Sequence, residues 1–392
     1  MKRMFLFKIL GLGLSIHSLS LSVFADTAKI NSRPRSLSMG GAGVAVAGDK
    51  DSASINPAGL ADIKRREYQV FPILIEAPLD SGVISSGLDY REALDKKDKT
   101  KQRDQLEKFL KNGQSSSQKI RVNFYPSYTR QNFHIGLLAE GELNAKMQVG
   151  GVGADLASEA GRSNITAGLI AAGGYGFFKN SLQVGVTLKP LYRFAVFEEA
   201  DQRPLDILKG KNRVAGSKIG VRDQLFGESL TDNKAFGFGG DLGVKYWFQD
   251  TGMAAFDRAL EILKPSVGLT LQDVGKTRFF TKRSTPPDVD QSLSAGLGFH
   301  PQWKKVQGTL AFDFRNLLQK EAFQNKIHLG AEARIYKFFL LRAGLSQMYL
   351  SGGLGLDFRY FQMDAYYASQ ETYEYAHNKA MHVLGLRLAA AL

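Results

Sequence analysis

The feature that most constrains this chain is a period-two alternation of side chains, which recurs from residue 67 to the C-terminus. In the segment 325–336, one face is purely apolar and comprises Ile327, Leu329, Ala331, Ala333 and Ile335. The opposite face holds glycine, histidine and charged residues. A strand places residues i and i+2 on the same face, whereas a helix would scatter them around its circumference. The alternation therefore predicts an all-β fold.

Fourteen segments of this kind follow one another along the chain. Their predicted bounds are 67–75, 119–130, 132–144, 163–177, 181–194, 235–248, 264–272, 291–300, 306–315, 325–336, 338–347, 352–360, 362–370 and 380–392. Most have the length that a tilted strand needs to cross a bilayer. Connections after odd-numbered segments are mostly long and those after even-numbered segments mostly short, as in outer-membrane barrels. We therefore predict a 14-stranded antiparallel transmembrane outer-membrane β-barrel.

Helices are expected only in the connections. Residues 249–263 form a long connection after an even-numbered segment, where the other connections are mostly short. The spacing of their apolar residues indicates a small amphipathic helix. Residues 90–111 are rich in strong helix formers and in charge. We interpret this second stretch as a solvated surface helix, with a partner-docking element as the alternative.

The first 25 residues have the pattern of a secretory signal peptide. Basic residues such as Lys2 and Lys8 precede an apolar stretch, and the small residues Val23 and Ala25 suit cleavage after Ala25. An uncleaved anchor is the alternative. The predicted organisation is a signal peptide at 1–25, an N-terminal plug at 26–66 and the barrel at 67–392, located in the bacterial outer membrane.

Composition and motifs argue against several other classes of protein. The net charge of +13 would suit nucleic acid, but a signal peptide makes that partner unexpected. The sequence has no Gly-x-Ser-x-Gly, His-Glu-x-x-His or phosphate-loop motif, and its histidines lie far apart. We therefore expect no enzyme activity, no cofactor and no metal.

Charged residues also occur on the predicted inward faces of the strands. The candidates are Glu140, Asp241, Lys245, Asp313, Arg315, Glu332, Arg334, Asp357, Arg359 and Arg387. Their mixed signs favour a salt-bridged interior, because charges inside a barrel need partners. The alternative is a selectivity lining or a carboxylate clamp for a ligand like a fatty acid.

The region between the signal peptide and the first strand is rich in small residues. It contains Met39-Gly40-Gly41-Ala42 and, later, the motif Asn56-Pro57-Ala58-Gly59. In this order the segment resembles the N-terminus of FadL-type outer-membrane transporters and of the related PorV-type barrels. Residues 330–347 and 352–370 look like the end of PorV-type barrels. An ordinary turn before a strand is the alternative for the motif.

The resemblance implies a lumen plugged by the N-terminal segment. In the FadL type the plug gates passive diffusion of small hydrophobic molecules such as long-chain fatty acids. In the PorV type the barrel binds or anchors exported proteins of a secretion system. Expected partners are therefore outer-membrane lipid with either a small hydrophobic ligand or exported proteins. One departure from the usual barrel ending is the last residue, Leu392, which is not aromatic.

Overall fold

The computed structural model of the chain describes a set of separate ranges. They are 33–79, 89, 105, 117–148, 158–197, 234–248, 260–280, 288–358, 360–371 and 380–392. The predicted signal peptide, nearly all of the predicted helix at 90–111 and the candidate Arg359 lie outside them. Of the predicted helix at 249–263, residues 260–263 are described, and they are helical.

Seventeen strands form one antiparallel sheet. They are β1 Glu67–Gln69, β2 Ile73–Pro78, β3 Ser117–Phe124, β4 Ser127–Arg130, β5 Phe133–Gln148, β6 Ser158–Phe177, β7 Leu182–Phe197, β8 Lys234–Trp247, β9 Ser266–Gln272, β10 Phe279–Phe280, β11 Ser292–Phe299, β12 Val306–Phe314, β13 Ile327–Ile335, β14 Phe339–Ser346, β15 Tyr349–Asp357, β16 Phe361–Glu371 and β17 Ala380–Ala390. Three short helices, α1 Pro34–Ser38, α2 Ser52–Ile55 and η1 Pro57–Asp62, precede them, and η2 Phe323–Lys326 lies between β12 and β13.

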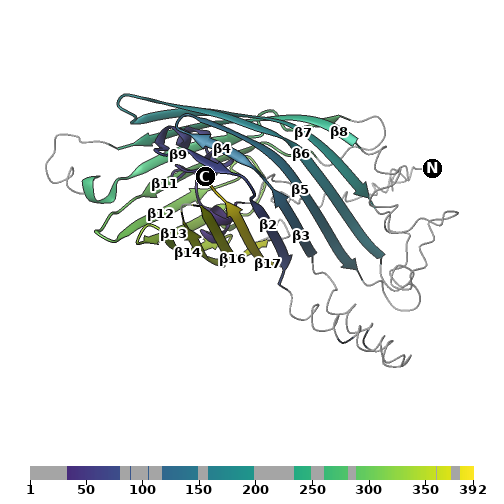
Figure 1. Cartoon of the computed structure of the whole chain (residues 1–392). Helices are drawn as coiled ribbons and strands as arrows, with labels where there is room; N and C mark the ends of the chain where they lie inside the picture. The colour runs from purple at the N-terminus through teal and green to yellow at the C-terminus, as the bar shows by residue number, and fades with distance from the viewer. Residues whose placement is uncertain are drawn as a thin grey trace, which may run out of the picture.

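The sheet closes into a barrel (Figure 1). Three short strands are continuations of longer ones. β3 and β4 both pair with β5, and β9 and β10 both pair with β8. β1 and β2 likewise form one strand, because β1 pairs with β4 and β2 pairs with β3. Fourteen transmembrane strands remain, and β17 pairs with β2 to complete the ring. The predicted 14-stranded antiparallel barrel is confirmed. Among the described residues, none of the helices has the length and apolar character needed to span a membrane.

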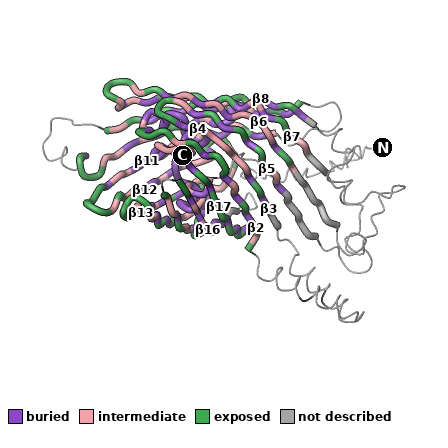
Figure 2. The backbone as a smooth tube through the Cα atoms, viewed as in Figure 1, coloured by how far each residue is buried: buried purple, intermediate pink, exposed green. Residues whose placement is uncertain are grey.

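Burial alternates along the strands as the sequence pattern predicted (Figure 2). In β17, Leu384, Leu386 and Leu388 are 42–46% exposed, whereas the intervening Arg387 is buried. The apolar set therefore faces outward, towards lipid. Leu392 continues that outward face, so the missing aromatic residue at the C-terminus leaves the alternation intact.

Two predicted strands are interrupted, which corrects their predicted bounds. The segment 67–75 breaks at residues 70–72, and the segment 119–130 breaks at residues 125–126. Pro72 and Pro126 lie in these breaks, and proline has no backbone N–H for a ladder. The three residues 70–72 lie opposite the two residues 125–126, so the wall bulges here. The Tyr125 N–H still donates to the Pro72 carbonyl at 3.4 Å, and the wall remains hydrogen-bonded.

The outward alternation makes a quantitative prediction for Leu386. We expect Leu386→Arg to lower the free energy of unfolding in lipid by about 2–4 kcal/mol, because a cation near the bilayer midplane is poorly solvated. The same change at Leu392, two residues beyond the end of β17, should cost about 0–1 kcal/mol. Urea titration of the barrel in vesicles measures both values. Equal costs at the two positions would contradict the assignment of Leu386 to the membrane interior.

Candidate functional site

Residues 33–63, called the N-terminal segment below, pack against the inward face of the wall on several sides. Its backbone lies directly against wall glycines. A Cβ added to Gly268 on β9 would lie 2.6 Å from the Val44 carbonyl oxygen, and one added to Gly330 on β13 would lie 2.5 Å from that of Met39. Glycine permits this close approach because it has no side chain. The segment contacts strands from both halves of the ring, so it lies inside the lumen (Figure 1).

The Asn56-Pro57-Ala58-Gly59 motif forms one compact turn. The Asn56 side-chain oxygen accepts from the Ala58 N–H at 3.2 Å and caps η1, while its amide donates to the carbonyls of Val44 and Val244 at 2.9 and 3.1 Å. Pro57 occupies the first turn of η1, where its fixed φ suits a helix start. The motif thus joins two parts of the N-terminal segment to β8. Leu60, the next residue, accepts from Asn132 in a short connection, which places η1 at the short-turn end of the barrel.

Three of the predicted lumen charges bind backbone groups of the N-terminal segment. Asp313 accepts from the backbone N–H groups of Gly43 and Val44 at 2.7 and 2.9 Å. Lys245 donates to the Ala47 carbonyl at 2.6 Å and pairs with Asp62 at 2.8 Å. Arg315 donates to the Gly41 carbonyl at 2.7 Å. These bonds satisfy backbone groups of a buried loop, which would otherwise be costly to desolvate.

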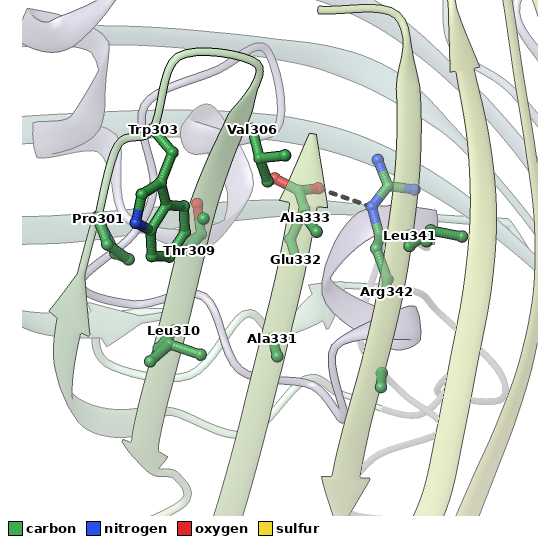
Figure 3. Close-up of a pocket in the computed structure, with 12 residues that line it drawn as sticks. Pro301, Trp303, Val306, Thr309, Leu310, Ala331, Glu332, Ala333, Leu341 and Arg342 are labelled. Carbon is green, nitrogen blue, oxygen red and sulfur yellow. Dashed lines mark hydrogen bonds and ion pairs between the residues drawn. The ribbon is translucent and has the colours of Figure 1, made fainter. Parts of the chain in front are cut away.

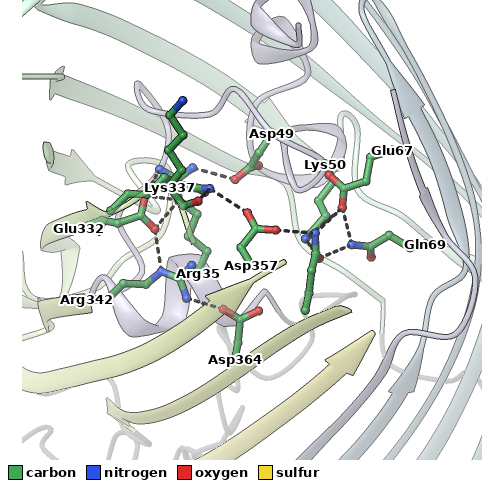
Figure 4. Close-up of polar contacts among 12 residues, drawn as sticks. Arg35, Asp49, Lys50, Glu67, Gln69, Glu332, Lys337, Arg342, Asp357 and Asp364 are labelled. Atoms are coloured by element: carbon green, nitrogen blue, oxygen red, sulfur yellow. Dashed lines mark hydrogen bonds and ion pairs between the residues drawn. The ribbon is translucent and has the colours of Figure 1, made fainter. Parts of the chain in front are cut away.

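An ion network fastens α1 to the opposite side of the ring (Figure 4). Arg35 pairs with Glu332 at 2.9 Å and with Asp49 at 2.8 Å. Glu332 also pairs with Arg342, which reaches Asp364. Burial acts to lower the pKa of Arg35, but the charges of Glu332 and Asp49 outweigh it and raise the pKa above its usual value. The guanidinium therefore stays charged, and each buried charge has a partner.

The remaining candidates that the structure describes take part in contacts of the wall itself. Arg387 pairs with Asp364 at 3.2 Å, Arg334 with Asp357 at 2.8 Å, Asp241 with Lys189 at 2.7 Å, and Glu140 accepts from Asn123 at 2.9 Å. The Gln362 amide donates to both Asp357 and Glu67 at 3.1 Å, which links Asp357 to β1. The nine candidates that the structure describes are therefore not brought into one site: some bind the N-terminal segment and others link strands of the wall to one another.

An apolar cluster inside the lumen was missed by the sequence reasoning. The lumenal apolar cluster consists of Leu138, Ile170, Leu191, Ala235, Phe279 and Val289, all buried, with Tyr125 packed against it. The bulge at residues 125–126 lets the Tyr125 ring turn inward over Gly136, where an added Cβ would meet the ring at 2.6 Å. A usable signal was present, because Leu137-Leu138 and Leu169-Ile170 place apolar residues on both faces of a strand.

The cluster is built on one row of the barrel register. Leu138 pairs with Gly168, Gly168 with Leu191, Leu191 with Gly237, and Gly237 with Phe279. Each glycine leaves room for its neighbour, because a Cβ on Gly168 would lie 2.9 Å from a Leu191 methyl and one on Gly237 would lie 2.7 Å from the Phe279 ring. Large apolar side chains therefore lie flat against the wall.

Charge borders the lumenal apolar cluster. The Arg193 guanidinium lies over the Phe279 ring at 4.2 Å and donates to Thr166 at 3.0 Å. By register, the cluster lies on the long-loop side of the N-terminal segment, since Gly174 and Gly185, nearer the short turns, contact Pro57. A molecule that enters from the long-loop end would thus meet an apolar surface before it meets the segment.

Solved structures with a similar fold include membrane channels. The CymD monoaromatic hydrocarbon channel has a TM-score of 0.50 at 12% identity, with 93% of this chain and 98% of that chain covered. The Ralstonia pickettii toluene transporter TbuX has a TM-score of 0.46 at 13% identity, covering 93% and 99%. A Pseudomonas aeruginosa FadL homologue has a TM-score of 0.33 at 10% identity, with 92% of this chain and 97% of that chain covered. No family model and no curated protein matches the chain. The likeness to the CymD channel, over nearly the whole of both chains, shows that the two proteins share a fold.

Proposed function

We propose that this protein is an outer-membrane channel that admits small hydrophobic molecules by passive diffusion. The observation that carries the proposal is the lumenal apolar cluster, a group of large apolar side chains in an interior that also holds many buried charged residues. Apolar side chains turned into a lumen gain nothing from lipid contact, so their use is to bind apolar material or to pack. The fold similarity to a hydrocarbon channel supports the same class of ligand.

The N-terminal segment is proposed to be the plug of this channel. Its bonds to Lys245 on β8, Asp313 on β12 and Glu332 on β13 attach it to three different strands of the wall. A molecule in the lumen can then reach the short-turn end only if the segment shifts. Otherwise the molecule must leave the lumen before it reaches the segment. Arg193, at the edge of the lumenal apolar cluster, supplies a positive charge that suits the carboxylate of a fatty acid.

The alternative remains a PorV-like barrel that binds or anchors exported proteins. Such a protein would recognise its partners through the long connections. The residues of those connections lie mostly outside the described ranges. This function therefore stays a prediction from sequence, and the transport experiment separates it from the first.

Substitution in the lumenal apolar cluster tests the transport proposal. We expect Leu191→Gln to lower the initial rate of toluene and oleate uptake into proteoliposomes about tenfold, since an unpaired amide replaces an apolar contact surface. Leu191→Met is the matched control, because it keeps volume and apolar character and should retain the rate. Both variants must show the heat-modifiable gel mobility of a closed barrel. Unchanged uptake of both probes in Leu191→Gln would favour the interaction role instead.

A further inference from the structure

An apolar pocket opens on the outward side of β12, β13 and β14 (Figure 3). Its volume is about 390 Å³. Leu310 and Leu341 on its walls are 49% and 39% exposed, so they belong to the lipid-facing set. Glu332 and Arg342 contribute from the same strands, but their buried side chains form the ion pair on the lumen side. The pocket is therefore a hollow in the lipid-facing surface and is separate from the lumen.

The hollow arises from side-chain size in the barrel register. Gly308 pairs with Ala333, and Ala331 pairs with Ala343, which puts four small residues side by side. The outward rows above and below hold large residues, namely Val306, Ile335 and Phe339 on one side and Phe312, Leu329 and Leu345 on the other. The depression is therefore bounded along the barrel axis at both ends.

Trp303 covers one end of the pocket. It lies in the short connection between β11 and β12, where its backbone N–H donates to the Val306 carbonyl at 2.8 Å. Gly308 makes room for this cover, since an added Cβ would meet Pro301 and Trp303 at 3.0 and 3.1 Å. Trp303 is 63% exposed, and Tyr336, an aromatic residue at the same end of the barrel, is 59% exposed. Tryptophan and tyrosine of this kind mark the headgroup level of a membrane.

Basic residues gather at the same mouth. Lys304 and Lys305 are exposed and directly follow Trp303, and the Lys305 ammonium lies 5.5 Å from the Tyr336 ring centre. The next short connection adds Lys337, and neither connection contains an acidic residue. An apolar hollow that begins at the headgroup level beside two cations matches a lipid with an acyl chain and a phosphate.

We propose that this pocket holds an acyl chain of a phospholipid of the periplasmic leaflet and that Lys304 and Lys305 bind its phosphate. Short turns face the periplasm in outer-membrane barrels, and that leaflet supplies the phospholipid. A second copy of the chain fits less well, because a two-fold contact here would set the lysines of one copy against those of the other. The proposal is independent of what passes through the lumen.

Filling the pocket tests acyl-chain binding. The probe is palmitoyl-oleoyl-phosphatidylglycerol, added to the purified full-length barrel in detergent, with the dissociation constant of the first bound lipid measured by native mass spectrometry. We expect Ala331→Phe with Ala343→Phe to weaken binding about tenfold, equivalent to losing contact for roughly two methylenes. The matched control is Ala171→Phe, at an outward position of β6 whose neighbours Ile135 and Leu188 are exposed.

Removing the cations tests phosphate binding. Lys304→Gln with Lys305→Gln should weaken binding of the same lipid about tenfold, and the loss should shrink at high salt. Lys179→Gln, in another short connection, is the control and should leave the affinity unchanged. The proposal is overturned if the phenylalanine variants bind as tightly as the parent protein, if the control variants lose as much affinity, or if the phenylalanine variants abolish a dimer without changing lipid binding. Heat-modifiable mobility establishes that each variant is folded.

Discussion

Deletion of residues 35–58 is expected to leave an inserted barrel whose conductance in planar bilayers is raised severalfold. The deleted stretch includes all of α1 except Pro34, the whole of α2 and the Asn56-Pro57-Ala58 turn, which together lie inside the ring. The interior of a barrel of this strand count is wide enough to pass water unless something occupies it. Without the segment, water and ions should therefore fill the lumen.

The wall should survive this deletion. The pairs between neighbouring strands, including β17 with β2 and β9 with β11, involve no residue of the N-terminal segment. Asp313 and Lys245 would lose bonds to the segment, but water entering the lumen would solvate them. The cost of leaving a charge buried without a partner therefore does not apply once the lumen is wet.

Single-channel recording and uptake of a hydrophobic solute, both on the purified variant, check this expectation. The full-length protein is the control, and heat-modifiable mobility reports that the variant barrel has closed. If conductance and uptake both match those of the full-length protein, the N-terminal segment is not a plug. The interaction role would then be the better account of the barrel.

The wall was predictable from sequence because alternation is a local property. Each outward face, such as Leu384 with Leu386 and Leu388, can be recognised within one strand. The interruptions at residues 70–72 and 125–126 were also marked, by Pro72 and Pro126. What could not be seen is that these two breaks lie opposite each other, because that depends on the register between strands.

Partners inside the lumen were not predictable for the same reason. Arg35 meets Glu332 across 297 residues of sequence, and Gly43 meets Asp313 across 270. The charge of a residue and the face of the strand on which it lies do not show which inward carboxylate will bind a given group of the N-terminal segment. The hollow at Ala331 and Ala343 was equally hidden, since alanine counts as apolar in the alternation and only the neighbouring rows show that it is small for its place.

Gly185→Leu is expected to displace the Asn56-Pro57-Ala58-Gly59 turn from the wall. A Cβ at Gly185 would overlap the Pro57 carbonyl carbon and the Ala58 nitrogen. These are backbone atoms, so no rotation of a side chain relieves the overlap. Overpacking of this kind costs about 1–3 kcal/mol or more when neighbours cannot yield. Here the segment can yield by leaving its site, whereas the closed wall cannot.

Thiol labelling measures the displacement, because the chain has no cysteine of its own and Ala61→Cys introduces a single reporter. Ala61 is 2% exposed, so its labelling by a maleimide reports opening of the segment. We expect Gly185→Leu to raise the labelling rate about tenfold or more, as a shift of about 1.4 kcal/mol in the opening equilibrium would do. Gly141→Leu is the matched control, since a Cβ there would meet nothing within 4 Å. Equal labelling of the two variants would show that the close contact at Gly185 does not hold the segment in the lumen.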